Sequence, residues 1–185
     1  APRVLAVVPG RVAALTAADV DADGFKDLVA EPALAEPALL LGFGDGTETM
    51  HLLDAGWRVI AIDSAPAAAE VLEGGVSGEA RDWLTTVTAP ADEVDLPPLD
   101  LLYSAYVLSY LPPDAFARLW SRVRERLRPG GFVVVNIFGD HHAWAGEPDT
   151  TFLPRGEVEV LLDGLEVIEL IEVEADADLF EALWL

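Results

Sequence analysis

Short apolar runs alternate with amphipathic stretches along most of the chain. Most of these runs have the length and composition of strands that are buried on both faces of a parallel sheet. Strands are predicted over residues 38–41, 57–62, 85–88, 99–104 and 132–138, and helices over residues 47–55, 64–73, 79–84, 114–127 and 155–162. Strands that alternate with helices in this way indicate an α/β fold.

Glycines interrupt the pattern after the first of these strands. Residues 42–46 read G-x-G-x-G, and the missing Cβ atoms allow tight turning and close approach by a ligand. The next strand ends at Asp63, at the edge where open α/β sheets bind ligands. A dinucleotide-binding fingerprint would need its third glycine at the position of Thr47. The stretch therefore predicts a ligand site near Asp63, with a spacing that departs from that of dinucleotide-binding proteins.

The first 37 residues carry the weakest pattern. We expect residues 1–37 to form an N-terminal segment of helices and loops that packs on a single domain over residues 38–185. Within this segment, helices are expected over residues 12–18 and 24–31, the second ended by Pro32.

An acidic loop lies between these two expected helices. Residues 19–27 follow the pattern D-x-D-x-D-G-x-x-D, in which alternating carboxylates can converge on a calcium ion. The twelfth position, where such a loop needs a bidentate Glu, is Ala30. We expect a solvated loop in which Asp23 caps a helix, and no metal site. A calcium-dependent interaction module is the alternative.

The composition narrows the classes of function. A chain of 185 residues with 52% hydrophobic content is long enough for one domain with a sizeable core. Its 33 acidic and 11 basic residues give a net charge of −22, which disfavours nucleic acid and anionic membranes as partners. The absence of cysteine excludes disulfides and thiolate chemistry. No apolar run reaches membrane-spanning length and no signal peptide opens the chain, so we expect a cytoplasmic monomer or homodimer.

The glycine turn, the acid after the next strand and a later L-R-P-G-G turn occur together in the order of a known family. From about Ala38 onward the chain resembles class I S-adenosylmethionine-dependent methyltransferases, in particular the small bacterial type that includes tellurite-resistance and thiol methyltransferases. The matching stretches are LLLGFGDGTETMHLLDAGWRVIAID, DLLYSAYVLSYLPPDAFARLW, LRPGGFVVVNIFGD and HHAWAGEPDTTFLPRGEVEVLLDGLEV. The resemblance implies a Rossmann-like sheet of seven strands, mostly parallel, with helices on both faces. Its last two strands, over residues 165–173 and 179–184, would form an antiparallel pair.

The resemblance also implies S-adenosylmethionine as the cofactor and S-adenosylhomocysteine as its product. Asp63 would accept hydrogen bonds from both ribose hydroxyls, a role that suits a carboxylate because it offers only acceptors. The other residues implied at the cofactor are Gly42, Phe43, Gly44 and Gly46 along the amino-acid part, Ser64 beside Asp63, Asp92 and Glu93 near the adenine, and Ser104 and Ala105 along the methionine and methyl region.

The implied reaction is in-line transfer of a methyl group to a small-molecule acceptor. A sulfonium already activates the methyl group, so the protein chiefly supplies alignment and excludes water. His141 and His142 follow the fifth strand and titrate near neutrality, which makes them candidate bases. The alternative is that this histidine pair belongs to a structural loop. Tyr106 and Tyr110 are candidates for orienting hydroxyl groups.

Three positions depart from the family pattern. Leu40 stands where an acid is usual, Phe43 where a cysteine is common and Thr47 where an arginine is common. These departures support a second hypothesis, a domain that keeps the fold with weak or altered cofactor binding and acts as a scaffold. The first hypothesis requires that the turn at residues 42–46 and the carboxylate of Asp63 flank one common space.

Overall fold

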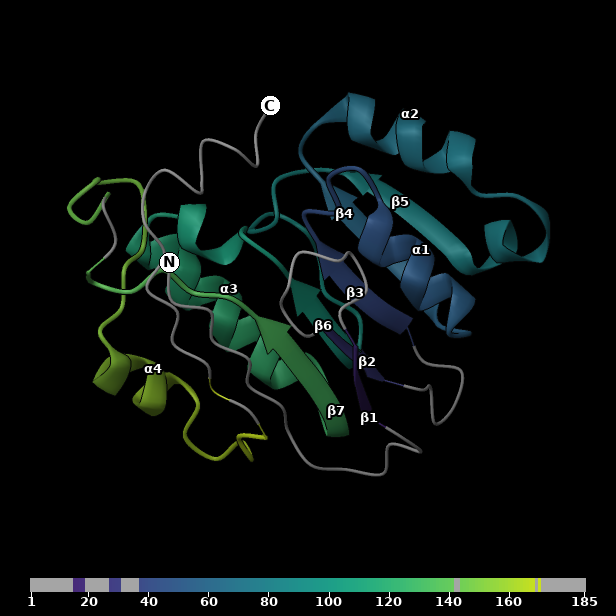
Figure 1. Cartoon of the computed structure of the whole chain (residues 1–185). Helices are drawn as coiled ribbons and strands as arrows, with labels where there is room; N and C mark the ends of the chain where they lie inside the picture. Colours follow the sequence, from purple (N-terminus) through teal and green to yellow (C-terminus); the bar gives the residue numbers. More distant parts are fainter. Residues whose placement is uncertain (1–14, 19–26, 31–36, 142–143, 169, 171–185) are drawn as a thin grey trace.

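A parallel sheet organises the molecule. The computed structural model describes residues 15–18, 27–30, 37–141, 144–168 and 170. Within them, five parallel strands pair in the order β5-β4-β3-β6-β7. The strands are β3 (Pro37–Leu41), β4 (Arg58–Asp63), β5 (Leu84–Thr88), β6 (Leu99–Ser104) and β7 (Leu127–Val135). All five arrows end at one edge of the sheet (Figure 1), and the prediction of an α/β parallel sheet is confirmed.

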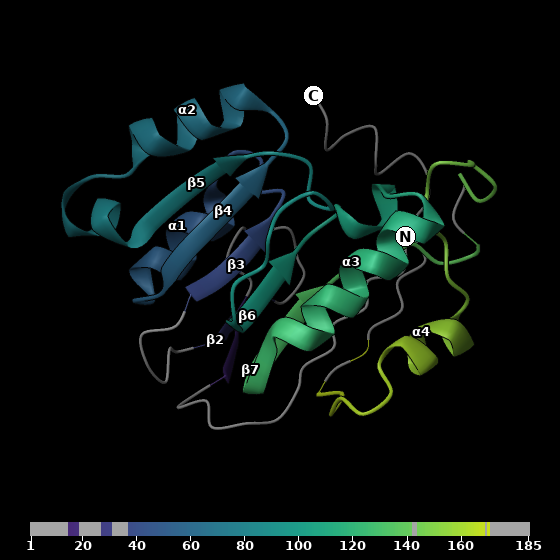
Figure 2. The same ribbon diagram turned by 180° about the vertical axis from the view of Figure 1, so that it is seen from behind.

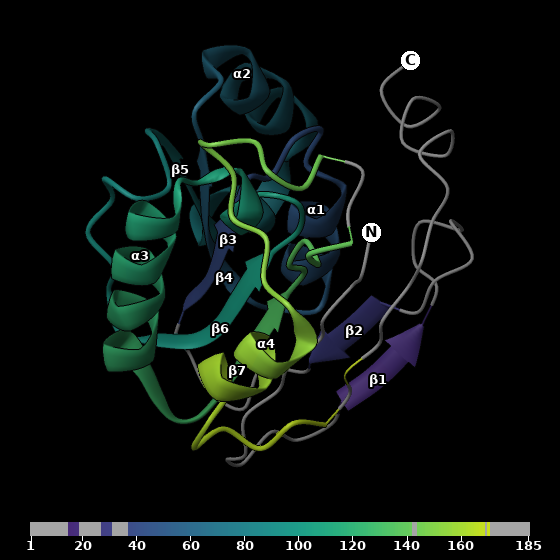
Figure 3. The same cartoon turned by 90° about the vertical axis from the view of Figure 1, so that its left-hand side faces the viewer.

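Helices connect these strands and cover both faces of the sheet. They are α1 (Thr47–Asp54), α2 (Pro66–Gly75), α3 (Pro113–Arg126) and α4 (Arg155–Leu161), with short 3-10 helices η1 (Gly78–Trp83) and η2 (Leu108–Tyr110). Figure 2 shows α3 lying across β6 and β7, and Figure 3 shows α1 on the opposite side of the sheet from α3. The predicted end of the first helix is confirmed, since Gly56 takes the left-handed conformation at φ 89°. The residue that caps α2 is Ala65, one position beyond the expected Ser64 or Asp63.

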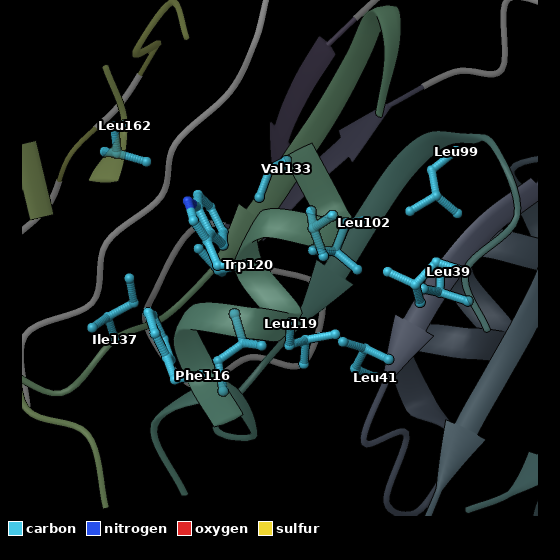
Figure 4. Packing of buried hydrophobic residues seen from close by; sticks show 14 of the residues in the cluster. Leu39, Leu41, Leu99, Leu102, Phe116, Leu119, Trp120, Val133, Ile137 and Leu162 are labelled. Carbon is cyan, nitrogen blue, oxygen red and sulfur yellow. The ribbon is translucent and has the colours of Figure 1, made fainter. Parts of the chain in front are cut away.

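Alternate residues of each strand enter two separate hydrophobic cores. On one face, Leu41 of β3 and Leu102 of β6 gather beside Leu119 of α3 (Figure 4). The predicted apolar stripe of α3 belongs to this core, and the indole nitrogen of Trp120 donates to the carbonyl oxygen of Leu161 (3.1 Å), which attaches α4. On the other face, Leu40 packs in a core with residues of α1 and α2. Each fully buried leucine contributes about 1.5–3 kcal/mol to stability.

The L-R-P-G-G turn lies inside a strand. It was predicted to precede a strand over residues 132–138, whereas β7 already begins at Leu127, which pairs with Leu99. The next pair is Leu101 with Phe132, so the intervening residues of β7 form an irregularity in the ladder. A Cβ at Gly131 would lie 2.9 Å from Cδ1 of Leu127, so this position has no room for a side chain.

The N-terminal helices are not present in the described residues. Strands β1 (Leu15–Ala18) and β2 (Asp27–Ala30) form an antiparallel pair, which corrects the helices expected over residues 12–18 and 24–31 and the helix cap assigned to Asp23. A short apolar stretch cannot be assigned to a helix or a strand from periodicity alone, and here pairing with a partner strand decides. Residues 19–26, which hold most of the candidate calcium loop, lie outside the described residues, and the division at residue 37 stays a prediction.

The C-terminal strand pair is only partly within the described residues. Residues 165–168 and 170 form no strand, contrary to the expectation for residues 165–173. Gly164 at φ 77° and a hydrogen bond from the amide of Leu165 to the carbonyl of Leu162 (2.9 Å) close a turn after α4 instead. The remainder of that expected strand, and the one over residues 179–184, lie outside the described residues. None of the helices seen in the described part of the chain could span a bilayer.

Candidate functional site

The glycine turn reverses the chain between β3 and α1. The amide of Gly42 donates to the carbonyl oxygen of Ile62 on β4 (2.7 Å), which extends the sheet by one residue. The amide of Gly46 then donates to the carbonyl oxygen of Phe43 (2.7 Å) and closes the turn. Positive φ values of 71°, 51° and 88° at Gly42, Gly44 and Gly46 explain why glycine occupies these positions.

The surroundings of these glycines differ. A Cβ at Gly42 would lie 2.0 Å from Cγ2 of Val107, and one at Gly46 would lie 2.7 Å from Cδ1 of Leu72. A Cβ at Gly44 would meet no described atom within 4 Å. The turn is therefore packed against the protein at its two ends, and it is at Gly44 that the backbone is open to a ligand.

The carboxylate of Asp63 lies against this open point. Its Oδ2 accepts a hydrogen bond from the amide of Gly44 (3.1 Å), and its Oδ1 accepts one from the amide of Ala65 (2.9 Å). Asp63 is partly exposed, and each of its oxygens keeps acceptor capacity for a further donor. Ser64 is exposed beside it. The required proximity of the turn and the carboxylate is confirmed, and the identity of the ligand stays a prediction.

Two of the departures from the family pattern are core residues. The side chain of Phe43 is 1% exposed and packs with Leu52 and Leu72, so it points away from the open side of the turn. The expectation that this side chain faces the cofactor is wrong, and only the backbone of Phe43 can contribute there. Leu40 is fully buried in the same core. The argument that a bulky residue 43 plugs the site therefore fails.

The segment after β6 bends sharply over the glycine turn. Tyr106 has a left-handed backbone (φ 55°), and its amide donates to Oδ1 of Asn136, the residue after β7. Such a conformation is costly for a residue other than glycine, so Asn136 stabilises the bend that brings Val107 against Gly42. Ala105, between β6 and this bend, is partly buried. The sequence patterns did not single out Asn136 or Val107, whose signals are a lone amide after a strand and one apolar residue.

Ser104 does not present its hydroxyl at this edge. Its side chain is 1% exposed, pairs in register with Leu41 and lies on the face of the sheet that α3 covers. Its Oγ has no hydrogen-bond partner among the described residues. The prediction that the Ser104 side chain lines the cofactor is corrected, because the alternation of β6 directs it into the core.

The acidic residues after β5 lie near the same edge. Asp63 pairs with Thr88 at the end of β5, and the amide of Ala89 donates to the carbonyl oxygen of Asp63 (3.0 Å). Nη2 of Arg122 donates to the carbonyl oxygen of Asp92 (2.8 Å), which fixes the backbone of the turn. Asp92 is partly buried and Glu93 is exposed. Their place is consistent with the predicted contact, which stays a prediction.

One candidate base is strongly exposed. The side chain of His141 is 85% exposed, and its Nε2 lies 3.9 Å from Oδ1 of Asp140. His142 lies outside the described residues. The exposure of His141 favours the interpretation of a loop residue, although exposure alone does not assign its chemistry.

Four aromatic side chains meet beside this edge. The ring of Tyr110 lies 5.2 Å from that of Phe138 and 6.4 Å from that of Trp144, measured between centroids, and Phe152 stacks on Phe138 at 5.9 Å. Burial raises the pKa of Tyr110 above 10.0, with a smaller contribution from the neighbouring Tyr106. Tyr110 is therefore a neutral hydroxyl at physiological pH. Apart from the sequence-level interest in Tyr110 as a hydroxyl, this cluster was not predicted, because its members come from separate loops.

Comparisons with known proteins agree with this geometry. A sequence profile described as a methyltransferase domain matches residues 39–133. Thiopurine S-methyltransferase of Aliivibrio fischeri (strain ATCC 700601 / ES114) is 32% identical over 80 residues, which are 43% of this chain and 37% of that protein.

Two solved structures share the fold. TehB from Haemophilus influenzae has a TM-score of 0.61 and 16% identity, covering 74% of this chain and 48% of that one. The glycopeptide N-methyltransferase MtfA, in complex with (S)-adenosyl-L-homocysteine, has a TM-score of 0.51 and 23% identity, covering 59% of this chain and 45% of that one. The chain thus spans less than half the length of each of these three proteins.

Proposed function

Because the chain belongs to the methyltransferase-domain family, we propose that it transfers a methyl group from S-adenosylmethionine to a small-molecule acceptor. The strongest support from the structure is the hydrogen bond between the amide of Gly44 and Oδ2 of Asp63. It joins the open point of the turn to a carboxylate with acceptor capacity left over, at the carboxyl edge of a parallel sheet.

The chemistry of the residues at this edge fits the cofactor. The acceptors of Asp63 suit a vicinal diol such as a ribose, and the exposed backbone at Gly44 leaves space beside it. Asp92 and Glu93 are the groups that we assign to the adenine. Bound S-adenosylmethionine would supply a methyl group that its sulfonium has already activated.

The remaining work of the protein is alignment and exclusion of water. The bend at Tyr106 and Val107 covers one end of the turn, and Ala105 leads into it, so this segment is our candidate for enclosing the methyl region. The hydroxyl of Tyr106 is a candidate for orienting the acceptor. His141, and His142 beside it in sequence, would serve as bases only for an acceptor that must lose a proton.

Calorimetric titration with S-adenosylhomocysteine tests the proposal. Asp63→Asn should weaken binding by about 10- to 100-fold, because a carboxylate that accepts hydrogen bonds becomes an amide with one acceptor. Asp82→Asn is the matched control, since Asp82 is an exposed acid in η1, before β5 and away from the carboxyl edge, and should bind as the native chain does. No heat with either S-adenosylhomocysteine or S-adenosylmethionine would defeat the proposal.

A further inference from the structure

The aromatic cluster has an exposed side. Tyr110 is 39% exposed and Trp144 is 44% exposed, whereas Phe138, whose ring meets both of theirs edge-on, is 1% exposed. Phe152 stacks behind Phe138 and is partly buried. The cluster therefore consists of two open rings supported by two rings beneath them.

Buried hydrogen bonds hold this cluster in place. Ser109 accepts at its hydroxyl from the amide of Phe138 (2.8 Å) and at its carbonyl from the amide of Thr151 (2.8 Å). The hydroxyl of Thr151 donates to the carbonyl of Leu111 (2.7 Å), and the amide of Leu153 donates to the carbonyl of Phe138 (2.9 Å). The segments that carry Tyr110, Phe138 and Phe152 are thus joined at fixed positions. Rings held in this way lose little entropy when a planar ligand stacks on them.

The cluster adjoins the proposed cofactor site. The amide of Tyr110 donates to the carbonyl of Val107 (3.0 Å), and Val107 packs over Gly42 of the turn. Tyr106 lies near enough to Tyr110 to raise the pKa of its hydroxyl. One short helical turn therefore separates the two open rings from the glycine turn.

The charges around the cluster are mainly negative. Asp140, Glu147 and Asp149 are exposed in the loop that carries Trp144. The nearest arginine along the chain after this loop, Arg155, forms an ion pair with Glu159 (3.0 Å). A ring that acquires positive charge between these aromatic faces would be stabilised by cation–π attraction and by the carboxylates.

We propose that Tyr110 and Trp144 bind the methyl acceptor and that this acceptor is a neutral, planar nitrogen heteroaromatic compound. The inference rests on the proposed function. The lone pair of the ring nitrogen forms the new N–CH₃ bond while the S–CH₃ bond breaks, and the bonding electrons stay on sulfur. The positive charge passes from sulfur to the ring, so no proton has to be removed. This accounts for a site whose nearby phenol, Tyr110, is neutral and whose described histidine, His141, is largely in solvent.

Binding of a product-like probe tests this inference. N-methylquinolinium, a planar cation, is titrated into the full chain with S-adenosylhomocysteine present, and the planar anion 2-naphthoate and the non-aromatic cation N,N-dimethylpiperidinium serve as comparisons. We expect N-methylquinolinium to bind about 10-fold more tightly than either comparison compound, since only it offers both a flat face and a positive charge. Trp144→Leu should weaken its binding by about 10-fold, and Trp144→Phe should restore part of the loss.

Trp83 provides the matched control. It is also 44% exposed, but η1 places it before β5, away from the carboxyl edge. Trp83→Leu should leave N-methylquinolinium binding unchanged, and all three tryptophan variants should bind S-adenosylhomocysteine as the native chain does. Equal binding of the three probes, or native affinity for N-methylquinolinium in Trp144→Leu, overturns the inference and leaves the proposed function intact. Loss of only the S-adenosylhomocysteine titration, with Trp144-dependent probe binding retained, defeats the proposed function and supports the rings as a ligand site.

Discussion

The carboxyl edge of the sheet has two halves that are built in different ways. The turn half, residues 42–46 with Asp63, is shaped by backbone hydrogen bonds and by one carboxylate within a single βαβ unit. The aromatic half, formed by Tyr110, Phe138, Trp144 and Phe152, depends on side chains from three separate segments. Backbone geometry thus provides the polar part of the site, and side-chain packing provides its apolar part.

This difference separates what a family shares from what one member can vary. A turn made by backbone amides and glycines tolerates few substitutions, because positive φ angles and close contacts restrict its residues. Exposed rings on a loop can change without disturbing the sheet. We therefore expect the turn half to be the less variable part of this fold, and the aromatic half to determine which acceptor binds.

The largest expected effect comes from removing the central ring of the aromatic half. Phe138→Ala should lower the free energy of unfolding by about 3–5 kcal/mol, because a fully buried aromatic side chain leaves a cavity beneath both exposed rings. Urea unfolding measures the change, and Val160→Ala, at a position 75% exposed on α4, is the control with little effect. A loss below about 1 kcal/mol would mean that Phe138 does not support the rings.

The turn half can be tested with two glycines that differ only in their surroundings. Gly42→Ala should cost about 2–4 kcal/mol, since the new Cβ meets Val107 at 2.0 Å in addition to the cost of a positive φ. Gly44→Ala should cost about 1 kcal/mol, because the same backbone cost arises in open space. Equal losses in thermal unfolding would show that contact with Val107 does not matter.

Much of the turn half could be predicted from the sequence. Glycines at fixed spacing, an apolar strand on either side and a terminal acid are local signals, and together they located the Gly44–Asp63 contact. Apart from β7, the core strands and helices also fall within two residues of their predicted bounds. Local periodicity suffices here because each parallel strand is buried on both faces and is bounded by turn residues.

The aromatic half and the side-chain directions could not be predicted in the same way. Phe43 and Ser104 stand at positions of the motif, but their orientation depends on strand alternation and on what the helices cover. The bond from Tyr106 to Asn136 joins residues 30 apart in sequence, and no local pattern reports such a contact. The N-terminal strands were missed because pairing between strands, and not their own periodicity, decides their conformation.

The link between the two halves gives a smaller expected effect. Asn136→Ala should cost about 1–2 kcal/mol, because the partly buried amide of Tyr106 loses its acceptor and its left-handed conformation loses support. Asn136→Asp keeps an acceptor at the same place and should recover part of this loss. S-adenosylhomocysteine titration of both variants should show weaker binding only for Asn136→Ala, since Val107 then no longer holds the turn. Unchanged stability in Asn136→Ala would mean that the bend is held by other contacts.

The smallest effect is a pH dependence that belongs to the aromatic half alone. Burial and the nearby Tyr106 raise the pKa of Tyr110 above 10.0, so the folded chain holds this proton more tightly than the unfolded chain does. The resulting stabilisation is fully present below pH 10.0 and is lost as the pH rises through the folded value. Unfolding measured across this range should therefore be less sensitive to alkali in Tyr110→Phe than in the native chain. Phenolate absorbance is the direct measurement, and loss of an early-titrating component in Tyr110→Phe, in place of a late one, would contradict the burial of Tyr110.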